Sequence, residues 1–153
     1  MKKGKKDSLE KYKTIFVEEF EGASVEEAIK NALDSLKMST DEIKIKVLFE
    51  GEPGLFGLEG SKPAKIKVFP NLDKVENLIK YFTIKLLNFV KEKISFVDIK
   101  IQDDVVEIKI IFDEKGILDK IKFLGVDNAL YTLIECFVNK ILSADYKIDI
   151  KFD

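Results

Sequence analysis

The chain has 153 residues, of which 46% are hydrophobic and 35% are charged, and its formal net charge at pH 7 is −2. These values are typical of a globular protein and exclude a long disordered polypeptide. No apolar run approaches the roughly 18 residues that a membrane-spanning helix needs.

The chain contains no histidine, arginine or tryptophan, so every cationic side chain is a lysine. Histidine is the usual general base near neutral pH and the commonest metal ligand, so its absence argues against catalytic triads and zinc sites. Lysine binds phosphate as a point charge and cannot make the bidentate contacts of a guanidinium. We therefore predict that the protein is not an enzyme and has no catalytic residue, no metal site and no cofactor.

A single cysteine, Cys136, excludes an internal disulfide and is typical of a reducing compartment. The N-terminus lacks the apolar core of a signal peptide, so we predict a cytoplasmic protein. Cys136 lies among apolar residues at helical spacing, which predicts a small core side chain rather than a nucleophile.

The first seventy residues predict a basic arm followed by a small domain. Residues 1–13 hold six lysines and two acidic residues, and we predict a disordered arm, either solubilising or in loose contact with RNA or anionic lipid. Residues 14–20 are rich in β-branched and aromatic residues and predict a strand. Ser24 and Glu27 are spaced as a capping box, which predicts the start of a helix that extends to about Lys37.

Two further strands, residues 43–49 and 64–69, alternate apolar residues with lysines. The segment between them holds four of the eight glycines and two of the three prolines. This clustering indicates a loop whose function depends on its main chain, because glycine tolerates positive φ and close backbone approach. Leu55 and Phe56 lie at the middle of this loop. They predict either a docking surface or a plug into the protein's own core.

The second half of the chain predicts six elements. They are a long helix capped by Asn71 or Asp73, strands at 97–101 and 106–112 joined by a turn at 102–104, a short helix at 116–123, a strong helix at 126–141 and a last strand at 146–152. The predicted fold class is therefore α+β. A β-α-β-β module spans residues 14–70, and an α-β-β-α-α-β module spans residues 71–153.

The first module resembles the N-terminal domain of the Jag family, also called KhpB or EloR, which are bacterial RNA-binding proteins. The resemblance rests on the helix at 24–33, the strand through Val47, and residues 54–58 followed by 61–64. The family typically places a basic residue before its glycine-aromatic-glycine turn, where this chain has Glu52 and Pro53.

The order of the second module is that of a type II KH domain, which follows the first domain in the Jag family. Residues 128–140 resemble the helix after the family's Gly-x-x-Gly loop, and this alignment puts the loop at residues 121–124. Both glycines are missing, and Gly125 lies one residue late. Since nucleotides pack on the backbone of this loop, Ile121 and Leu124 would place side chains where the RNA should lie. The arginine and histidine that mark the family's usual last domain are absent, so we expect a shortened, degenerate member.

The resemblance implies a regulatory RNA-binding protein that acts with a small KH-domain partner or as a homodimer. It also implies links to cell elongation, to cell-wall synthesis and to the YidC-type membrane insertase. The candidate phosphate contacts are Lys115, Lys120, Lys122 and Lys62, and a site made of lysines alone should bind RNA weakly and in a salt-sensitive way.

An alternative hypothesis is a protein-interaction adaptor that kept the KH fold and lost RNA affinity. Its anchors would be the residues of the glycine loop, namely Gly54, Leu55, Phe56 and Gly57.

Overall fold

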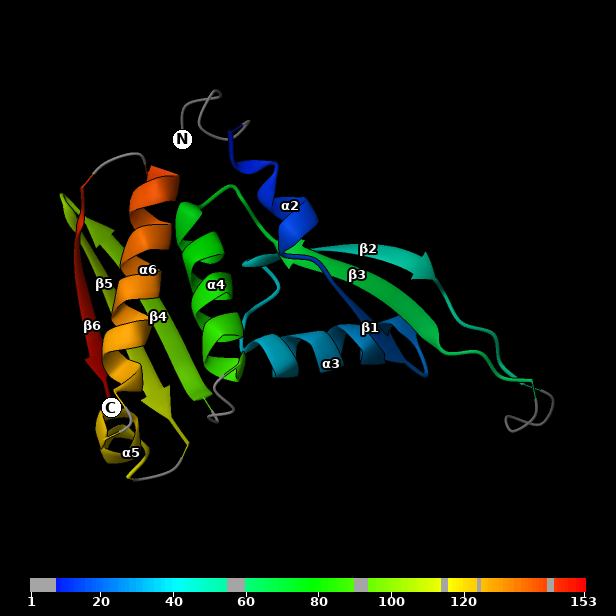
Figure 1. Ribbon diagram of the computed structural model, residues 1–153. Helices are drawn as coiled ribbons and strands as arrows, with labels where there is room; N and C mark the ends of the chain where they lie inside the picture. The colour runs from blue at the N-terminus through cyan, green and yellow to red at the C-terminus, as the bar shows by residue number, and fades with distance from the viewer. Residues whose placement is uncertain (1–7, 55–59, 90–93, 114–115, 124, 143–144) are drawn as a thin grey trace. The chain divides into compact units, whose positions relative to one another are not determined.

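The computed structural model describes residues 8–54, 60–89, 94–113, 116–123, 125–142 and 145–153. The chain divides into two compact units, Met1–Asp73 and Lys74–Asp153 (Figure 1). Both units combine helices with a three-stranded sheet, which confirms the predicted α+β class. The boundary between the units lies three residues after the predicted end of the first module at residue 70.

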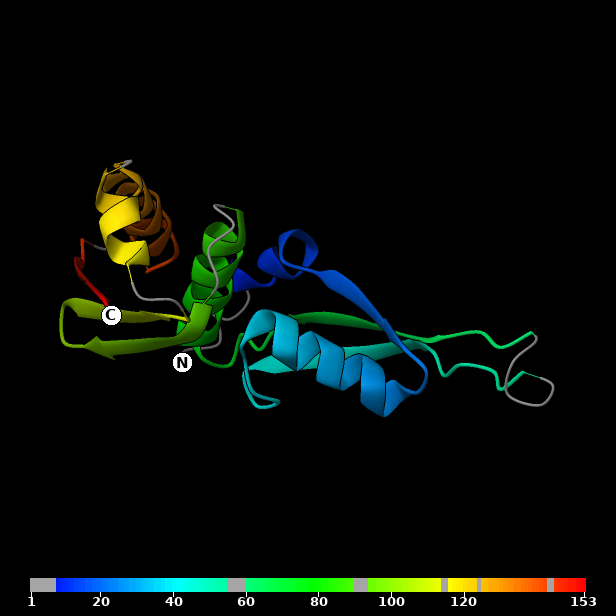
Figure 2. The same cartoon turned by 90° about the horizontal axis from the view of Figure 1, so that it is seen from below.

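The first unit is a sheet with one long helix on one face. Its elements are α2 (Tyr12–Ile15), β1 (Glu18–Gly22), α3 (Val25–Leu36), β2 (Ile43–Phe49) and β3 (Ala64–Pro70). The strand order is β1-β3-β2, so β3 is central and antiparallel to both neighbours. Helix α3 contacts β1 and β3, and Figure 2 shows it lying along one side of the sheet. The core between them is made of fully buried residues, which are Ala28, Ala32, Leu36, Ala64, Ile66 and Val68.

Helix α3 begins at the predicted capping box. The Ser24 hydroxyl accepts a hydrogen bond from the Glu27 amide at 3.2 Å, and the Glu27 carboxylate accepts one from the Ala23 amide at 2.8 Å. The carboxylate therefore reaches one residue further back than a capping box predicts. Gly22 allows this approach of helix to strand, because a Cβ there would lie 2.4 Å from the Ala28 nitrogen.

The predicted start of the first unit is wrong in two places. The strand predicted at residues 14–20 begins only at Glu18, and Tyr12–Ile15 form a helical turn. Leu9 and Tyr12 are only 1% and 7% exposed, so residues 8–13 are not a disordered arm. The spacing of Leu9, Tyr12 and Phe16 is that of one helix face, and the rings of Tyr12 and Phe16 stack at 6.2 Å. The remainder of the predicted arm lies outside the described residues.

The second unit has the predicted order of elements. They are α4 (Val75–Phe89), β4 (Ile94–Gln102), β5 (Val105–Phe112), α5 (Ile117–Phe123), α6 (Val126–Leu142) and β6 (Lys147–Phe152). Strand β5 is central, with β4 antiparallel and β6 parallel to it. Helices α4 and α6 lie side by side on one face of this sheet (Figures 1 and 2), where the rings of Phe82 and Phe137 stack at 4.0 Å.

The turns of the second unit follow the sequence closely. Asp103 has a positive φ of 54° and forms the predicted turn between β4 and β5. Helix α4 begins at Val75, later than either predicted cap. Asn71 instead donates a side-chain hydrogen bond to the Asp41 carbonyl oxygen at 2.9 Å. This bond joins the segment after β3 to the segment before β2.

Cys136 is exposed, which contradicts the predicted core position. The buried side of α6 carries Leu130, Ile134 and Val138. Cys136 is two residues from both Ile134 and Val138, and successive residues turn about 100° around a helix, so its side chain points away from the core.

Candidate nucleic-acid interface

The connection between α5 and α6 is the predicted nucleotide-binding turn. Helix α5 continues to Phe123, and α6 starts at Val126, so the connection is shorter than the alignment with a Gly-x-x-Gly loop predicts. Gly125 has a positive φ of 69° and its amide donates to the Lys122 carbonyl oxygen at 3.0 Å. Nothing lies within 4 Å of where a Gly125 Cβ would be, so the space beside this glycine is open.

Ile121 does not occupy the space that the sequence alignment assigned to it. It lies inside α5 and is only 2% exposed, so its side chain belongs to the core of the second unit. The prediction that Ile121 blocks a nucleotide cleft is therefore wrong. Leu124, the other predicted blocking residue, lies outside the described residues.

Two of the predicted phosphate contacts flank this turn. Lys120 and Lys122 are both exposed on α5. Lys115 lies outside the described residues. The turn therefore offers two lysines and one accessible glycine, with Asp119 of α5 and Asp127 of α6 close by in sequence, and falls short of a complete KH loop.

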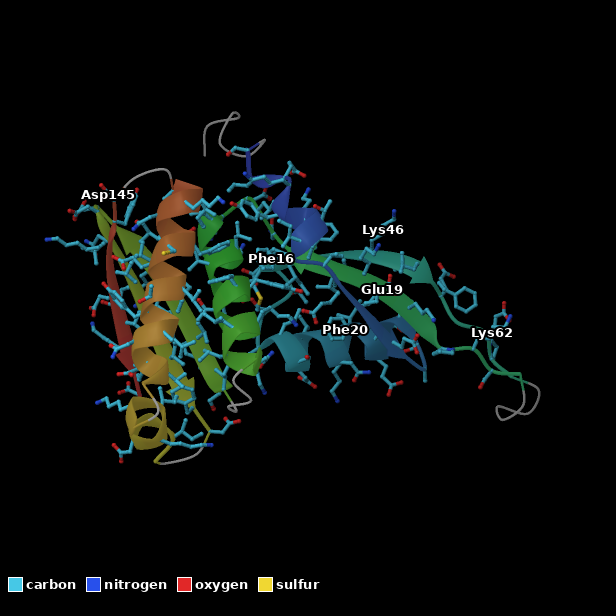
Figure 3. All side chains as sticks on the ribbon, in the orientation of Figure 1. Phe16, Glu19, Phe20, Lys46, Lys62 and Asp145 are labelled. Atoms are coloured by element: carbon cyan, nitrogen blue, oxygen red, sulfur yellow. The ribbon has the colours of Figure 1, made fainter. Side chains whose placement is uncertain are left out.

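The fourth predicted contact, Lys62, belongs to the first unit and pairs with Glu52. The two residues exchange backbone hydrogen bonds of 3.0 and 2.9 Å, and Lys62 Nζ lies 3.3 Å from Glu52 Oε2. Both side chains are more than half exposed. Glu52 therefore offsets much of the charge that Lys62 could offer to an anion. In Figure 3, Lys62 lies on the extension of the hairpin beyond the sheet.

The glycine loop is described only at its two ends. Gly51 has a φ of 90°, and a Cβ there would lie 3.1 Å from the Ala64 nitrogen, so glycine is required where the hairpin leaves the sheet. Gly54 is partly buried. The other predicted interaction residues, Leu55, Phe56 and Gly57, lie outside the described residues.

The face of the first sheet opposite α3 carries lysines that were not predicted as a site. Because Ile43, Ile45, Ile66 and Val68 face the helix side, the alternate residues of β2 and β3 face the other way. We call these four side chains the lysine face, and they are Lys44, Lys46, Lys65 and Lys67. Figure 3 shows Lys46 extending from β2 on the side away from α3.

Strand β1 neutralises one half of the lysine face. Glu21 lies opposite Lys65 and Glu19 lies opposite Lys67 in the β1–β3 register, with Nζ–Oε1 distances of 2.8 and 4.0 Å. The hydrogen bond from Lys65 to Glu21, with the attraction between their charges, raises the pKa of Lys65 above its usual 10.5. No ion pair of Lys44 or Lys46 joins them to an acidic residue in the described part of the chain.

A pocket adjoins the lysine face where the sheet passes into the hairpin. Its volume is about 400 Å³, and its lining residues are Glu21, Phe49, Lys62, Pro63 and Lys65. A bulge between Val47 and Phe49 shifts the register so that Phe49 lies opposite Lys65. An aromatic ring, a proline ring and two lysines therefore meet in one depression.

The corresponding open face of the second sheet has no such excess of lysine. Lys151 Nζ lies 3.0 Å from Glu107 and 3.4 Å from Asp149, and Lys109 Nζ lies 3.5 Å from Asp153. The hydrogen bond to Glu107, followed by the charge of Glu107 and then the interactions with Asp149, raises the pKa of Lys151. These pairs balance the charge of the second sheet.

Two further features of the site regions concern metals and membranes. Within the described ranges, no cluster of three or more histidine, cysteine, aspartate or glutamate residues could hold a metal ion. The helices seen in the described segments are all too short or too polar to cross a bilayer.

Comparison with known proteins finds a match to part of the first unit. Residues 20–70 match the family model of the Jag N-terminus. The matched segment runs from the middle of β1 to the end of β3 and so contains α3, the hairpin and the lysine face. This match confirms the predicted resemblance of the first module to the Jag N-terminal domain.

A curated relative matches a stretch of similar length. The RNA-binding protein KhpB of Bacillus subtilis (strain 168) is 34% identical over 55 residues, which are 36% of this chain and 26% of that protein. The chain thus spans about a quarter of the length of the curated relative that it matches.

Proposed function

We propose that this protein is a Jag-like RNA-binding regulator without catalytic activity. The observation that carries the proposal is the match of residues 20–70 to the Jag N-terminus, together with the similarity of a 55-residue stretch to a protein named for RNA binding. The second unit supports it, because its α-β-β-α-α-β order is that of a type II KH domain and its α5–α6 turn keeps an open glycine.

On this proposal the second unit is a reduced KH module. Lys120 and Lys122 contact phosphates beside the turn at Gly125, and the glycine lets the RNA backbone approach. With point charges in place of guanidinium forks, binding is weak, depends strongly on salt and shows little preference between bases.

The test is fluorescence anisotropy of a labelled single-stranded RNA of roughly 12 nucleotides, titrated with the full chain. We expect log K to fall linearly with log salt between about 50 and 200 mM. Lys120→Gln/Lys122→Gln should reduce both the affinity and this slope. Lys140→Gln/Lys147→Gln is the charge-matched control, since both of these exposed lysines lie on other elements. Absence of binding at the lowest salt would refute the proposal.

We extend the same proposal to the partners that a Jag-like protein implies. These are a small KH-domain protein or a second copy of this chain, the YidC-type membrane insertase, and the apparatus of cell elongation and cell-wall synthesis. Copurification from native cells with and without ribonuclease tests this extension. Partners held through RNA should be lost after ribonuclease treatment, whereas directly bound partners should remain.

A second candidate function is a protein-interaction adaptor that retains the fold. The observation in its favour is that Val47 and Leu48, at the end of β2 that leads to the glycine loop, are each 43% exposed. On this alternative, a direct partner survives ribonuclease treatment and is lost in Leu48→Gln, while RNA binding is absent.

A further inference from the structure

The lysine face has an unbalanced charge that the fold itself does not explain. Lys46 of β2 lies directly opposite Lys67 of β3, and both side chains are on the side of the sheet away from α3. Like charges opposite each other across two strands are destabilising. Glu19 lies 4.0 Å from Lys67 and offsets its charge, whereas no ion pair in the described part of the chain offsets that of Lys46. The surplus charge at this point of the exposed face is therefore suited to binding an anion.

The arrangement of the four lysines favours an extended polyanion over a single small anion. Lys44 and Lys46 are two residues apart on one strand, so their Cα atoms are about 6.6 Å apart, and neighbouring strands are about 4.8 Å apart. The lysines of this face therefore form two adjacent rows, one on β2 and one on β3. The contrasting sheet of the second unit, whose lysines Lys109 and Lys151 pair with acidic residues, has no comparable surplus.

The pocket beside the lysine face adds an apolar surface that a simple polyanion would not contact. Phe49 and Pro63 line it together with Lys62, Lys65 and Glu21. An aromatic ring that adjoins lysines is the combination that binds single-stranded nucleic acid, because bases stack on the ring while phosphates contact the charges. An acidic peptide would pair with the lysines and leave the ring unused.

We propose that the lysine face and its pocket form a second RNA-binding site, located on the Jag N-terminal segment and specific for single strands. Phosphates contact Lys44 and Lys46, and one base enters the pocket against Phe49. This inference rests on the proposed function, and it adds a site distinct from the α5–α6 turn of the second unit.

The experiment compares two charge-matched variants of the full chain with wild type in the anisotropy titration described above. Lys44→Gln/Lys46→Gln removes two lysines of the face without breaking an ion pair described in the structure. Lys30→Gln/Lys37→Gln is the control, because both lysines are exposed on or just after α3, on the other side of the sheet. Thermal unfolding of both variants checks that the fold is kept.

The expected result is a loss of roughly tenfold in affinity for Lys44→Gln/Lys46→Gln, with the slope of log K against log salt reduced by about 1.4 for two lost phosphate contacts. The control should keep the wild-type slope. Phe49→Leu should weaken binding by about tenfold with the slope unchanged, because it removes stacking and keeps the charge.

Three outcomes would overturn the inference. If wild type binds no RNA, the proposed function and this site fail together. If wild type binds and both double variants lose affinity equally, the face is not a site, and the proposed function stands on the α5–α6 turn alone. If polyglutamate competes as well as RNA per charge and Phe49→Leu has no effect, the face binds an acidic polypeptide instead.

Discussion

Lys62 Nζ lies 3.3 Å from Glu52 Oε2, at the base of the hairpin and beside the pocket of the first unit. Glu52 stands in the region where the Jag family typically has a basic residue. A carboxylate at this position lowers the positive potential of the pocket. It also forms an ion pair with Lys62, which the sequence predicted to contact RNA.

We therefore expect Glu52→Gln to strengthen RNA binding by about two- to threefold, since an exposed pair at this distance interacts by about 1 kcal/mol before screening. The unfolding free energy should change by less than about 1 kcal/mol, as for other exposed ion pairs. Anisotropy at low and high salt measures the first effect and urea unfolding the second. Weaker RNA binding in Glu52→Gln would contradict the expected role of the pair.

Ile121 offers a test of the corrected view of the α5–α6 region. Because its side chain is buried in the second unit, Ile121→Ala should destabilise the protein by about 2–5 kcal/mol, and Ile121→Val by about 0.5–1.5 kcal/mol. Lys122→Ala, one residue on and exposed, should leave stability nearly unchanged. Urea unfolding of the three variants decides this. If Ile121→Ala were as stable as wild type and bound RNA more tightly, the side chain would be in the cleft after all.

The capping box of α3 predicts a difference between two serines of the same helix. Ser24→Ala should cost about 1 kcal/mol, because the Glu27 amide loses its acceptor. Ser35→Ala, in the exposed last turn of α3, should be neutral or slightly stabilising because alanine has the higher helix propensity. Thermal and urea unfolding measure both. Equal stability of the two variants would show that the cap contributes nothing.

The raised pKa of Lys65 predicts a pH dependence at the alkaline end. Since the pKa is higher in the folded state than its usual 10.5, the pairing with Glu21 contributes its full stability below about pH 10.5. This contribution is lost as the pH rises through the folded-state value. The stability difference between wild type and Lys65→Gln should therefore shrink above pH 10.5. Unfolding by urea across this pH range, at low salt, is the measurement, and a constant difference for Lys65→Gln would contradict it.

Periodicity was enough to predict most elements of this chain. The alternating residues of β5 and the capping box of α3 identify their structures directly, because a strand or helix with one buried face carries its period in its own sequence. The first helical turn was not predicted. Thr14, Ile15 and Val17 are residue types that favour a strand, whereas the burial of Leu9 and Tyr12 depends on packing against the rest of the chain.

The candidate sites were harder to predict because they depend on contacts between distant segments. The lysines of β2 and β3 are visible as an alternating pattern, but only the β1-β3-β2 order puts Lys46 beside Lys67 and gives Lys65 an acidic partner. Likewise, the pairing of Lys62 with Glu52 depends on the hairpin register. The residue alignment put Ile121 in a loop, whereas the structure continues α5 to Phe123.

On the proposed function, this protein contacts RNA directly in its own cells. Ultraviolet crosslinking of the tagged full chain, purification under denaturing conditions and mapping of the adducts by mass spectrometry test it most directly. We expect RNA above the background of an untagged strain, with adducts on peptides that contain residues 44–49 or 116–125. A tagged protein that carries no crosslinked RNA, while a known RNA-binding protein from the same cells does, would contradict it.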